Sequence, residues 1–359
     1  MRVAVAGAGS FGKNHLRVYR ELETAGAGVE LVAAVEPDSA RATEKAEKYE
    51  IPVFSSVAEL LAADLKLDAA TVAVPTVHHH AVASTLLDAG IDLLVEKPIA
   101  ATIAEADDLI ARAEKNKRIL QPGHLERFNP AVLAIQSQLR RPMFFEAHRL
   151  SVFTPRALDV DVVLDLMIHD LDIVLTFAAS PVREVRAVGL PILSPKVDIA
   201  NVRVEFESGC VANFTASRVS TERVRKLRFF EPRQYVSIDY ARQDLLVIRV
   251  DGAAAASLPT EIAAMIAAGK ADPALLAKLA NAGTGGPAPG LSFVKPPVTP
   301  GEPLRLEIES FLESVRTRRH PLVTARQGRE ALALALEIQS SMAAHAKRAG
   351  LEDFFNPST

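Results

Sequence analysis

Cysteine, excess charge and long apolar runs are scarce in this sequence of 359 residues. Its single cysteine, Cys210, allows neither an intrachain disulfide nor a thiolate metal cluster, and it fits a reducing cytoplasm. The 41 basic and 44 acidic residues leave a net charge of -3, which excludes the electrostatic footprint of a nucleic-acid or membrane-surface protein. No run approaches the roughly 18 apolar residues of a membrane span, and the opening MRVAVAGAGSFG is too short and too glycine-rich for a signal sequence. We therefore expect a soluble, cytoplasmic protein without nucleic-acid or membrane partners.

The first third of the chain alternates short apolar runs with helical patterns. Two domains are expected at this length, because a single core stops growing at about 250 to 300 residues. The alternation is typical of strand-helix-strand units, so we assign residues 1–122 to a Rossmann domain with a doubly wound parallel sheet. Two reciprocal helix caps are expected, one between Ser56 and Glu59 and one between Thr102 and Glu105. The expected strands are Arg2–Ala6, Glu30–Val35, Val53–Phe54, Ala69–Val74, Ile91–Val95 and Arg118–Gln121.

Residues 123–359 have a different pattern and are assigned to an α+β domain for substrate binding and oligomerisation. In VRVEFE, Val202, Val204 and Phe206 alternate with polar residues, as in a half-buried strand. Similar runs at 210–217, 224–231, 234–239 and 244–250 predict a mostly antiparallel sheet with one open, wetter face. The helical segments LDLMIHDLDIVLTFAA and EALALALEIQSSMAAHAKRA are expected to cover one face. A second subunit would naturally cover another face of the sheet, so we expect a homo-oligomer, either a dimer or a tetramer.

An Ala/Gly/Pro-rich stretch, about 252–303, interrupts the sheet domain. Two short helices, TEIAAMIAAG and DPALLAKLA, are expected before the breaker GTGGPAPG. We interpret the stretch as an inserted excursion that forms a lid or an oligomer contact, and a disordered surface loop is an equally good interpretation.

The motif GAGSFG follows the first expected strand and opens a helix. Gly7 would allow a tight turn, Gly9 the close approach of a pyrophosphate, and Gly12 the packing of helix on strand. Free amides and the helix dipole would hold the phosphates, with Ser10 and Phe11 in the same loop. The motif therefore predicts a dinucleotide site.

Further residues are expected around that cofactor. Glu36 ends the second strand, where a carboxylate accepts hydrogen bonds from the adenosine ribose and repels a 2′-phosphate, so NAD is preferred over NADP. The nearby Arg41 would weaken that preference. In VPTVHHH, Pro75 and Thr76 are expected to border the cofactor cleft, and His79 is counted with the cofactor-binding residues. Adjacent residues on a helix point about 100 degrees apart, so the three histidines cannot chelate one ion and no metal is expected.

Two segments carry candidate catalytic side chains. In DLLVEKPIAA a buried strand runs directly into Glu96, Lys97 and a proline, at the end of a strand where open parallel sheets bind ligands. In LDLMIHDLD a helix would bring Asp165 and His169, four residues apart, to one face, with Asp172 on the same side. Taken alone, this second segment favours a buried histidine satisfied by an acidic neighbour. Together with the glycine motif and the strand-end lysine, it favours a catalytic site.

These motifs, in this order, resemble the Gfo/Idh/MocA oxidoreductases, the family of glucose-fructose oxidoreductase and inositol dehydrogenase. The resemblance spans nearly the whole chain and includes the closing segment PLRLEIESFLESVRTRRHPLVTARQGREALALALEIQSS. It implies NAD(P) in a Rossmann domain and a sugar or polyol in the cleft beside an open-sheet domain. It also implies that Lys97, Asp165 and His169 are catalytic, with Glu96 and Lys97 close to the cofactor. We expect His169 to act as general base, Lys97 to stabilise the developing alkoxide and Asp165 to orient the sugar.

The segments KNHLRVYREL, GHLERFNPAV and LDLMIHDLDIVL look like the nucleotide-sugar branch of this family, closest in appearance to UDP-N-acetylglucosamine 3-dehydrogenases. That resemblance implies oxidation at C3 and places His124, Arg127 and Asn129 near the nicotinamide and the sugar. Arg149 or Arg156 would then meet the diphosphate through charge-assisted hydrogen bonds. For Arg127, an ion pair with Glu126 or with an interdomain acid is an equally good interpretation.

Two other functions stay open at this point. One is a dehydrogenase of a free sugar or polyol such as inositol. The other is a non-catalytic NAD-binding sensor, which would have no need of Lys97, Asp165 and His169 together.

Overall fold

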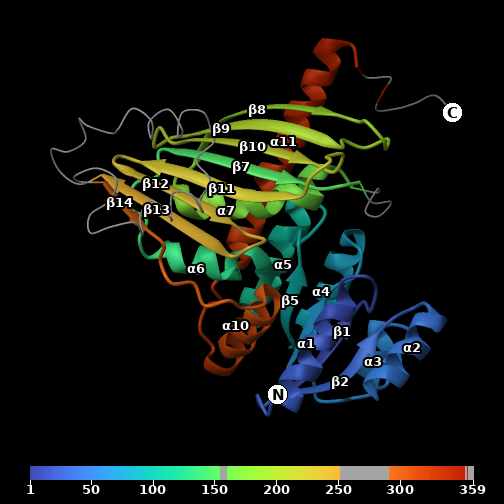
Figure 1. Cartoon of the computed structure of the whole chain (residues 1–359). Helices are drawn as coiled ribbons and strands as arrows, with labels where there is room; N and C mark the ends of the chain where they lie inside the picture. The colour runs from blue at the N-terminus through green and yellow to red at the C-terminus, as the bar shows by residue number, and fades with distance from the viewer. Residues whose placement is uncertain (154–159, 251–290, 352–353, 355–359) are drawn as a thin grey trace. The chain divides into compact units, whose positions relative to one another are not determined.

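A computed structural model describes residues 1–153, 160–250, 291–351 and 354 of the chain (Figure 1). The chain divides into two compact units, each described by itself below. The first unit comprises Met1–Phe128 and Gly301–Leu336, and the second comprises Asn129–Pro300 and Glu337–Thr359. In the described residues no helix is long and apolar enough to cross a membrane.

A six-stranded parallel sheet forms the centre of the first unit, with strand order β3-β2-β1-β4-β5-β6. The order reverses between β1 and β4, and in such sheets the ligand lies outside the carboxyl ends of the strands at that switch point. Every strand predicted for this domain is confirmed: β1, β2 and β3 have the predicted bounds, and the ends of β4, β5 and β6 differ by one or two residues. The strands are β1 (Arg2–Ala6), β2 (Glu30–Val35), β3 (Val53–Phe54), β4 (Ala69–Val72), β5 (Asp92–Glu96) and β6 (Leu120–Gly123).

Helices connect these strands, and their caps follow the local sequence. The capping box of Thr102 and Glu105 is present, as predicted. The second predicted cap is half wrong: Ser56 accepts from the Glu59 amide, but the Glu59 carboxylate reaches one residue further, to the amide and hydroxyl of Ser55. The helices are α1 (Gly12–Thr24), α2 (Ser39–Tyr49), α3 (Val57–Ala62), α4 (His79–Asp88), α5 (Ile103–Lys115) and the short η1 (Thr76–His78) and η2 (Leu125–Phe128).

A helix from late in the sequence completes the first unit. Helix α10 (Pro303–Thr317) buries Leu304, Ile308 and Phe311 in the same hydrophobic cluster as Leu16 and Tyr19 of α1 (Figure 1). The domain boundary predicted from the sequence, at residue 123, places these residues of α10 in the second domain. The apolar stripe of α10, spaced three and four residues apart, is instead buried on the first unit, where it covers α1.

The second unit is built on an eight-stranded sheet with the order β14-β13-β12-β11-β7-β10-β9-β8. The pair β7–β10 is parallel and the other described neighbours are antiparallel, so the predicted mixed α+β class is confirmed. The strands are β7 (Phe144–Leu150), β8 (Val182–Leu190), β9 (Ile199–Phe206), β10 (Val211–Ser217), β11 (Val224–Glu231), β12 (Gln234–Asp239), β13 (Asp244–Val250) and β14 (Leu291–Val294).

The two faces of this sheet differ in polarity. On β9, Val202, Val204 and Phe206 are buried, as predicted, and Arg203 is exposed on the opposite face. Helix α7 (Ile168–Ala178) packs on the buried face of the sheet (Figure 1). There the centroids of the Phe177 and Phe229 rings lie 5.9 Å apart. The remaining helices are α6 (Pro130–Gln136), the π-helical turn η3 (Val163–Met167) and α11 (Ala325–Ala349).

Helix α11 passes from one unit to the other, with residues 325–336 in the first and 337–349 in the second. Within the second unit it lies along the edge strand β8, where the Ala187 amide donates to the Ser341 hydroxyl at 3.1 Å. A side chain on Gly189 would place a Cβ 2.4 Å from the Met342 sulfur, so the glycine permits this close contact. Most of the inserted stretch 252–303, including both helices expected there, lies outside the described residues.

Candidate active site

The glycine loop between β1 and α1 is closely packed at two of its three glycines. Gly7 has φ +93°, and a Cβ there would lie 2.6 Å from the Ala73 carbonyl oxygen. A Cβ on Gly12 would lie 1.8 Å from the Gly7 oxygen. A Cβ on Gly9 would meet none of the described atoms within 4 Å, so this position faces open space. Among the described residues, no side chain caps the first turn of α1, so its backbone amides could bind the oxygens of a pyrophosphate.

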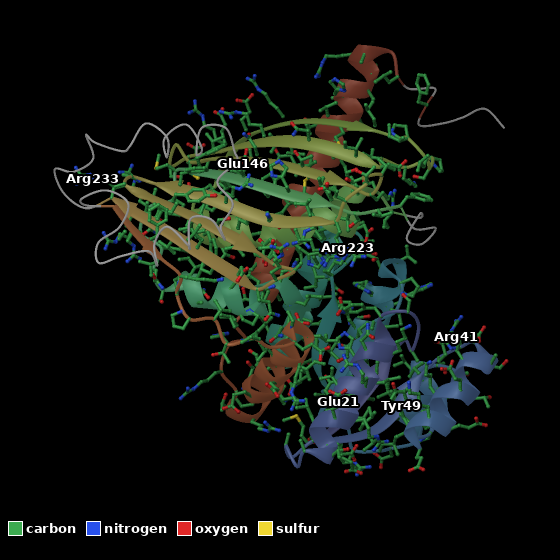
Figure 2. The ribbon with its side chains drawn as sticks, viewed as in Figure 1. Glu21, Arg41, Tyr49, Glu146, Arg223 and Arg233 are labelled. Carbon is green, nitrogen blue, oxygen red and sulfur yellow. The ribbon has the colours of Figure 1, made fainter. Side chains whose placement is uncertain are left out.

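Glu36 lies directly beneath this loop. Its carboxylate accepts from the Ala8 amide at 3.2 Å, the Asp38 amide at 3.1 Å and Arg41 Nη2 at 2.8 Å. The hydrogen bond to Glu36 raises the pKa of Arg41 above its ordinary value. Glu36 is buried, while the side chain of Arg41, near the start of α2 and labelled in Figure 2, is half exposed. A carboxylate and a guanidinium therefore meet where the adenosine ribose would bind.

A basic groove continues from the loop along α1 and α2. This cavity of about 520 Å³ is lined by five cationic side chains and by the carboxylate of Glu44. The cationic residues are Lys13, Arg17, Arg41, Lys45 and Lys48. Several are paired with acids, including Lys45 with Glu44, yet the lining favours an anionic ligand. The residues of the loop and groove thus fit a bound dinucleotide.

The three adjacent histidines of the first unit lie in different surroundings. His78 is exposed, and His80 contacts Asp108 at 2.7 Å. His79 is buried, and its ring nitrogens face the carbonyl oxygens of Val74 and Pro98. No group of three potential ligands in the described parts of the chain could hold a metal ion. His79 therefore contacts the backbone of two strand ends, while Pro75 and Thr76 begin the short helix η1.

The candidate lysine follows the last residue of β5. Glu96 is buried and contacts His15 of α1, and Lys97 continues the chain between Glu96 and Pro98. The next strand, β6, ends at Gly123 and leads to His124 and Arg127, both buried, and the Arg127 guanidinium reaches the Leu322 carbonyl at 3.5 Å. Lys97, His124 and Arg127 thus follow the carboxyl ends of neighbouring strands in the first unit.

Two predicted substrate residues of the second unit have structural contacts that the sequence did not reveal. The Arg149 guanidinium is buried and forms two hydrogen bonds to Asp170, at 2.7 and 3.1 Å, above the Tyr240 ring. Asn129 caps α6 through the Ala131 amide and donates to the Tyr240 carbonyl at 3.0 Å. The guanidinium of Arg149 is therefore occupied by an internal acid. Arg156, the other candidate for the diphosphate, lies outside the described residues.

The segment with Asp165 and His169 is not a regular α-helix. Val163–Met167 forms a π-helical turn in which the Ile168 amide bonds to the Val163 carbonyl, and α7 begins only at Ile168. The prediction of a continuous α-helical face was wrong for this reason, because an i→i+5 turn holds one more residue than an α-turn. Both side chains are half-buried, whereas Asp172 is buried. Single π-turns inside helices are frequent at functional sites.

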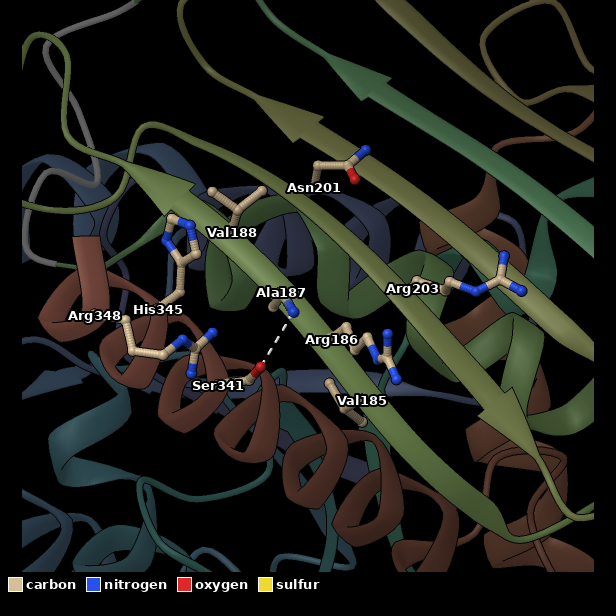
Figure 3. Close-up of a pocket in the computed structure, with 9 residues that line it drawn as sticks. All are labelled: Val185, Arg186, Ala187, Val188, Asn201, Arg203, Ser341, His345 and Arg348. Atoms are coloured by element: carbon tan, nitrogen blue, oxygen red, sulfur yellow. Dashed lines mark hydrogen bonds between the residues drawn. The ribbon is translucent and has the colours of Figure 1, made fainter.

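Another cavity of the second unit contains none of the predicted site residues. This cavity has a volume of about 580 Å³. Figure 3 shows its lining residues, which include Arg186 and Arg203 of neighbouring strands and His345 and Arg348 of α11. Arg186 and Arg203 are paired with Glu184 and Glu205, so both charges are compensated locally.

Comparisons with known proteins agree on the class of this architecture. A family model described as "Oxidoreductase family, NAD-binding Rossmann fold" matches residues 1–124, and the GFO/IDH/MocA C-terminal domain matches residues 131–233. The UDP-N-acetylglucosamine 3-dehydrogenase of Acidithiobacillus ferrooxidans is 32% identical over 97% of this chain and 99% of that protein. Its solved structure covers 96% of this chain and 98% of its own, with a TM-score of 0.81 and 31% identity. The inositol 2-dehydrogenase of Acidothermus cellulolyticus is 30% identical over 52% of this chain and 56% of that protein.

Proposed function

This chain belongs to the Gfo/Idh/MocA family of NAD-binding oxidoreductases, and we propose that it oxidises the C3 hydroxyl of UDP-N-acetylglucosamine or a close nucleotide sugar. The observation that carries the proposal is the match to a UDP-N-acetylglucosamine 3-dehydrogenase along almost the full length of both chains. Membership of the family supports a sugar dehydrogenase. That the substrate is a nucleotide sugar is our proposal.

The proposed reaction removes a hydride and a proton from one secondary alcohol and leaves a ketone. The bound nicotinamide would accept the hydride. His169 takes the hydroxyl proton as general base, and Lys97 stabilises the negative charge that develops on the oxygen. Asp165 orients the sugar, and His124 and Arg127 complete the proposed substrate contacts. Histidine is the side chain that enzymes use most often for general acid-base catalysis, and His169 is half-buried.

The cofactor would lie on the glycine loop. Gly7, Gly9 and Gly12 leave room for the pyrophosphate, and the first-turn amides of α1 would bind it together with Ser10. Glu36 would accept hydrogen bonds from the ribose hydroxyls, so we propose NAD as the preferred cofactor. Arg41 is already paired with Glu36, which lowers its availability for a 2′-phosphate.

The Arg149 guanidinium is paired with Asp170 inside the second unit, which argues against its predicted role as a diphosphate ligand. Arg127 remains the proposed basic contact. Cytoplasmic localisation, which rests on the single cysteine, stays a prediction.

A panel of substrates tests the proposal. NADH formation should be robust with UDP-N-acetylglucosamine and NAD when glutamate and a partner aminotransferase remove the keto product. Free N-acetylglucosamine and myo-inositol should give little turnover. The second candidate, a free sugar or polyol dehydrogenase, is favoured by the similarity to inositol 2-dehydrogenase and predicts the reverse order of substrates.

A further inference from the structure

Both neighbours of Lys97 are held by buried histidines. We propose that His15 and His79 are positioning residues for Lys97: His15 fixes the Glu96 side chain and His79 fixes the Pro98 carbonyl, so the lysine is anchored from both sides. This inference rests on the proposed role of Lys97 in the reaction, and it assigns tasks to two residues that do not carry out the chemistry themselves.

The first anchor comes from α1, the helix that begins at the glycine loop. His15 is 0% exposed, and its Nε2 lies 2.8 Å from Glu96 Oε1. The Phe11 and His15 rings pack in an edge-to-face arrangement with their centroids 5.4 Å apart. Within the described part of the chain, His15 Nδ1 is buried without a hydrogen-bond partner. A leucine would fill the same volume without that cost, so packing alone does not explain a histidine here.

The Glu96 carboxylate has one further contact, within its own segment. Its second oxygen accepts from the Lys97 amide at 3.3 Å. On the neighbouring strand, a Cβ on Gly123 would lie 3.0 Å from the carboxylate carbon and from Oε1, so the glycine leaves space on that side of the carboxylate. The contact with His15 therefore restricts a side chain that the neighbouring strand leaves unrestricted.

The second anchor comes from the first residue of α4. His79 is 1% exposed, with Nδ1 at 2.8 Å from the Pro98 oxygen and Nε2 at 2.9 Å from the Val74 oxygen. Burial lowers the pKa of His79, against the opposing effect of the two carbonyl oxygens and the charge of Glu96. A neutral imidazole has one N–H, so His79 can donate to only one of these two oxygens, and we assign the proton to Nδ1, which donates to the Pro98 carbonyl after the end of β5.

The two anchors also connect the lysine to the cofactor loop. His15 lies one turn into the helix whose N-terminus would hold the pyrophosphate, so a shift of α1 would be transmitted to Glu96. Catalysis depends strongly on such placement, because a displacement of about 1 Å in a reacting group can cost on the order of 100-fold in rate. Rigid positioning of the catalytic group by neighbouring hydrogen bonds is the general solution to that requirement.

Replacing each histidine by Gln or Asn distinguishes a role in positioning Lys97 from a role in packing alone, because each amide retains one of the two ring-nitrogen positions. Gln reproduces the donor at Nε2 of histidine, and Asn the donor at Nδ1. His15→Gln should therefore retain turnover within about threefold, whereas His15→Leu should lower kcat by about 10- to 100-fold. At position 79 the order reverses: His79→Asn keeps a donor directed at the Pro98 carbonyl and should retain kcat, while His79→Gln places its donor toward the Val74 carbonyl instead and should lower kcat.

The readouts are kcat, the KM for the sugar, and the Kd for NADH measured by fluorescence on the full-length enzyme. Positioning predicts that kcat falls while KM and Kd change by less than about threefold. His80→Asn, which removes a half-exposed ring paired with Asp108, serves as the matched control and should behave like the unmodified enzyme. Equal kcat for the Leu and Gln variants of His15, or for the Asn and Gln variants of His79, would overturn the inference.

A second readout needs no substrate. The rate at which an amine-reactive ester modifies Lys97, followed by mass spectrometry of its peptide, should change in His15→Leu and His79→Gln and stay constant in His15→Gln and His79→Asn. An unchanged rate in all four variants would contradict the positioning role. If Lys97→Met keeps full turnover, the proposed role of Lys97 fails instead, and the modification rates still show whether the two histidines hold it.

Discussion

At the scale of single residues, the account depends on a lysine, a histidine and a carboxylate placed by different elements. Lys97 follows β5, His169 lies at the start of α7, and Glu36 follows β2. Two of the three have neighbours that explain their position: His15 and Glu96 for Lys97, and Ala8 for Glu36. Substitutions at these residues should therefore affect chemistry or cofactor choice rather than folding.

Turnover should depend strongly on both Lys97 and His169. Lys97→Met removes the cation that stabilises the alkoxide, and His169→Ala removes the base that accepts the hydroxyl proton, so each should lower kcat by about 10²- to 10⁴-fold. NADH binding, followed by fluorescence, should stay within about threefold of the unmodified enzyme. The exposed Lys66→Met is the matched control. Near-normal turnover in either variant would refute the role assigned to that residue.

Cofactor choice should depend on Glu36. In Glu36→Ser the repulsion of a 2′-phosphate is lost while Arg41 remains, so the ratio of Kd values for NADP and NAD should fall by about tenfold. Glu47→Ser removes an exposed carboxylate from α2, the helix that carries Arg41, and should leave this ratio of Kd values unchanged. If the unmodified protein already binds NADP more tightly than NAD, the proposed preference is wrong.

At the scale of elements, the loop from β8 to β9 is held by one buried acid. Asp198 accepts from the amides of residues 192–194, from the Ser194 hydroxyl and from Arg218 Nε. Burial alone would raise the pKa of Asp198, but the hydrogen bonds from Ser194 and these amides outweigh burial and lower it to about 2. This loop connects the two outermost strands on one side of the sheet.

The low pKa of Asp198 predicts a pH-dependent stability. Its ordinary value is 3.8, so the unfolded chain binds the proton more tightly and the stabilisation is present above about pH 4. It is lost as the pH falls through about 2. The difference is equivalent to about 2 kcal/mol. Urea unfolding of Asp198→Asn should show a lower free energy of unfolding at pH 6, and the gap to the unmodified protein should narrow by pH 3. Glu184→Gln, half exposed on β8, is the control, and an equal gap at both pH values would contradict the account.

Elements governed by local sequence were predictable, and elements governed by distant partners were not. Each predicted strand of the parallel sheet formed, and the Thr102–Glu105 cap formed, because periodicity and capping are properties of a few adjacent residues. The π-turn before α7 was missed because its sequence matches an α-helix equally well. The docking of α10 on α1 depends on a core some 300 positions earlier in the chain, which no local pattern reveals.

The same division applies to the candidate site. The glycine loop and the EKP turn were identified because their spacing has a local mechanical reason. Asp170 was missed as the partner of Arg149, because that pair joins β7 to α7 across 21 positions. His15 carried no signal at all, since its partner Glu96 lies 81 positions away.

At the scale of the whole molecule, the outer face of the eight-stranded sheet carries paired charges. Glu146 on β7 lies 3.3 Å from Arg228 on β11, and Figure 2 shows Glu146 on this sheet. Half-exposed ion pairs of this kind contribute little to the stability of the fold. We propose that a second subunit covers this open face of the sheet.

Light scattering should therefore give a mass of at least twice the 38.6 kDa chain. Glu146→Arg would place like charges opposite each other and should shift the population toward the monomer. A monomeric mass for the unmodified protein at working concentration would remove the proposal.

The most direct test of the central claim follows one hydrogen from the sugar to the cofactor. UDP-N-acetylglucosamine carrying deuterium at C3 should transfer that deuterium to NAD, and mass spectrometry should detect deuterated NADH, whereas substrate labelled at C4 should give unlabelled NADH. Labelled NADH from the C3 substrate alone is the result this account predicts. NADH that is labelled only from the C4 substrate, or no NADH from either while free sugars are oxidised, would contradict it.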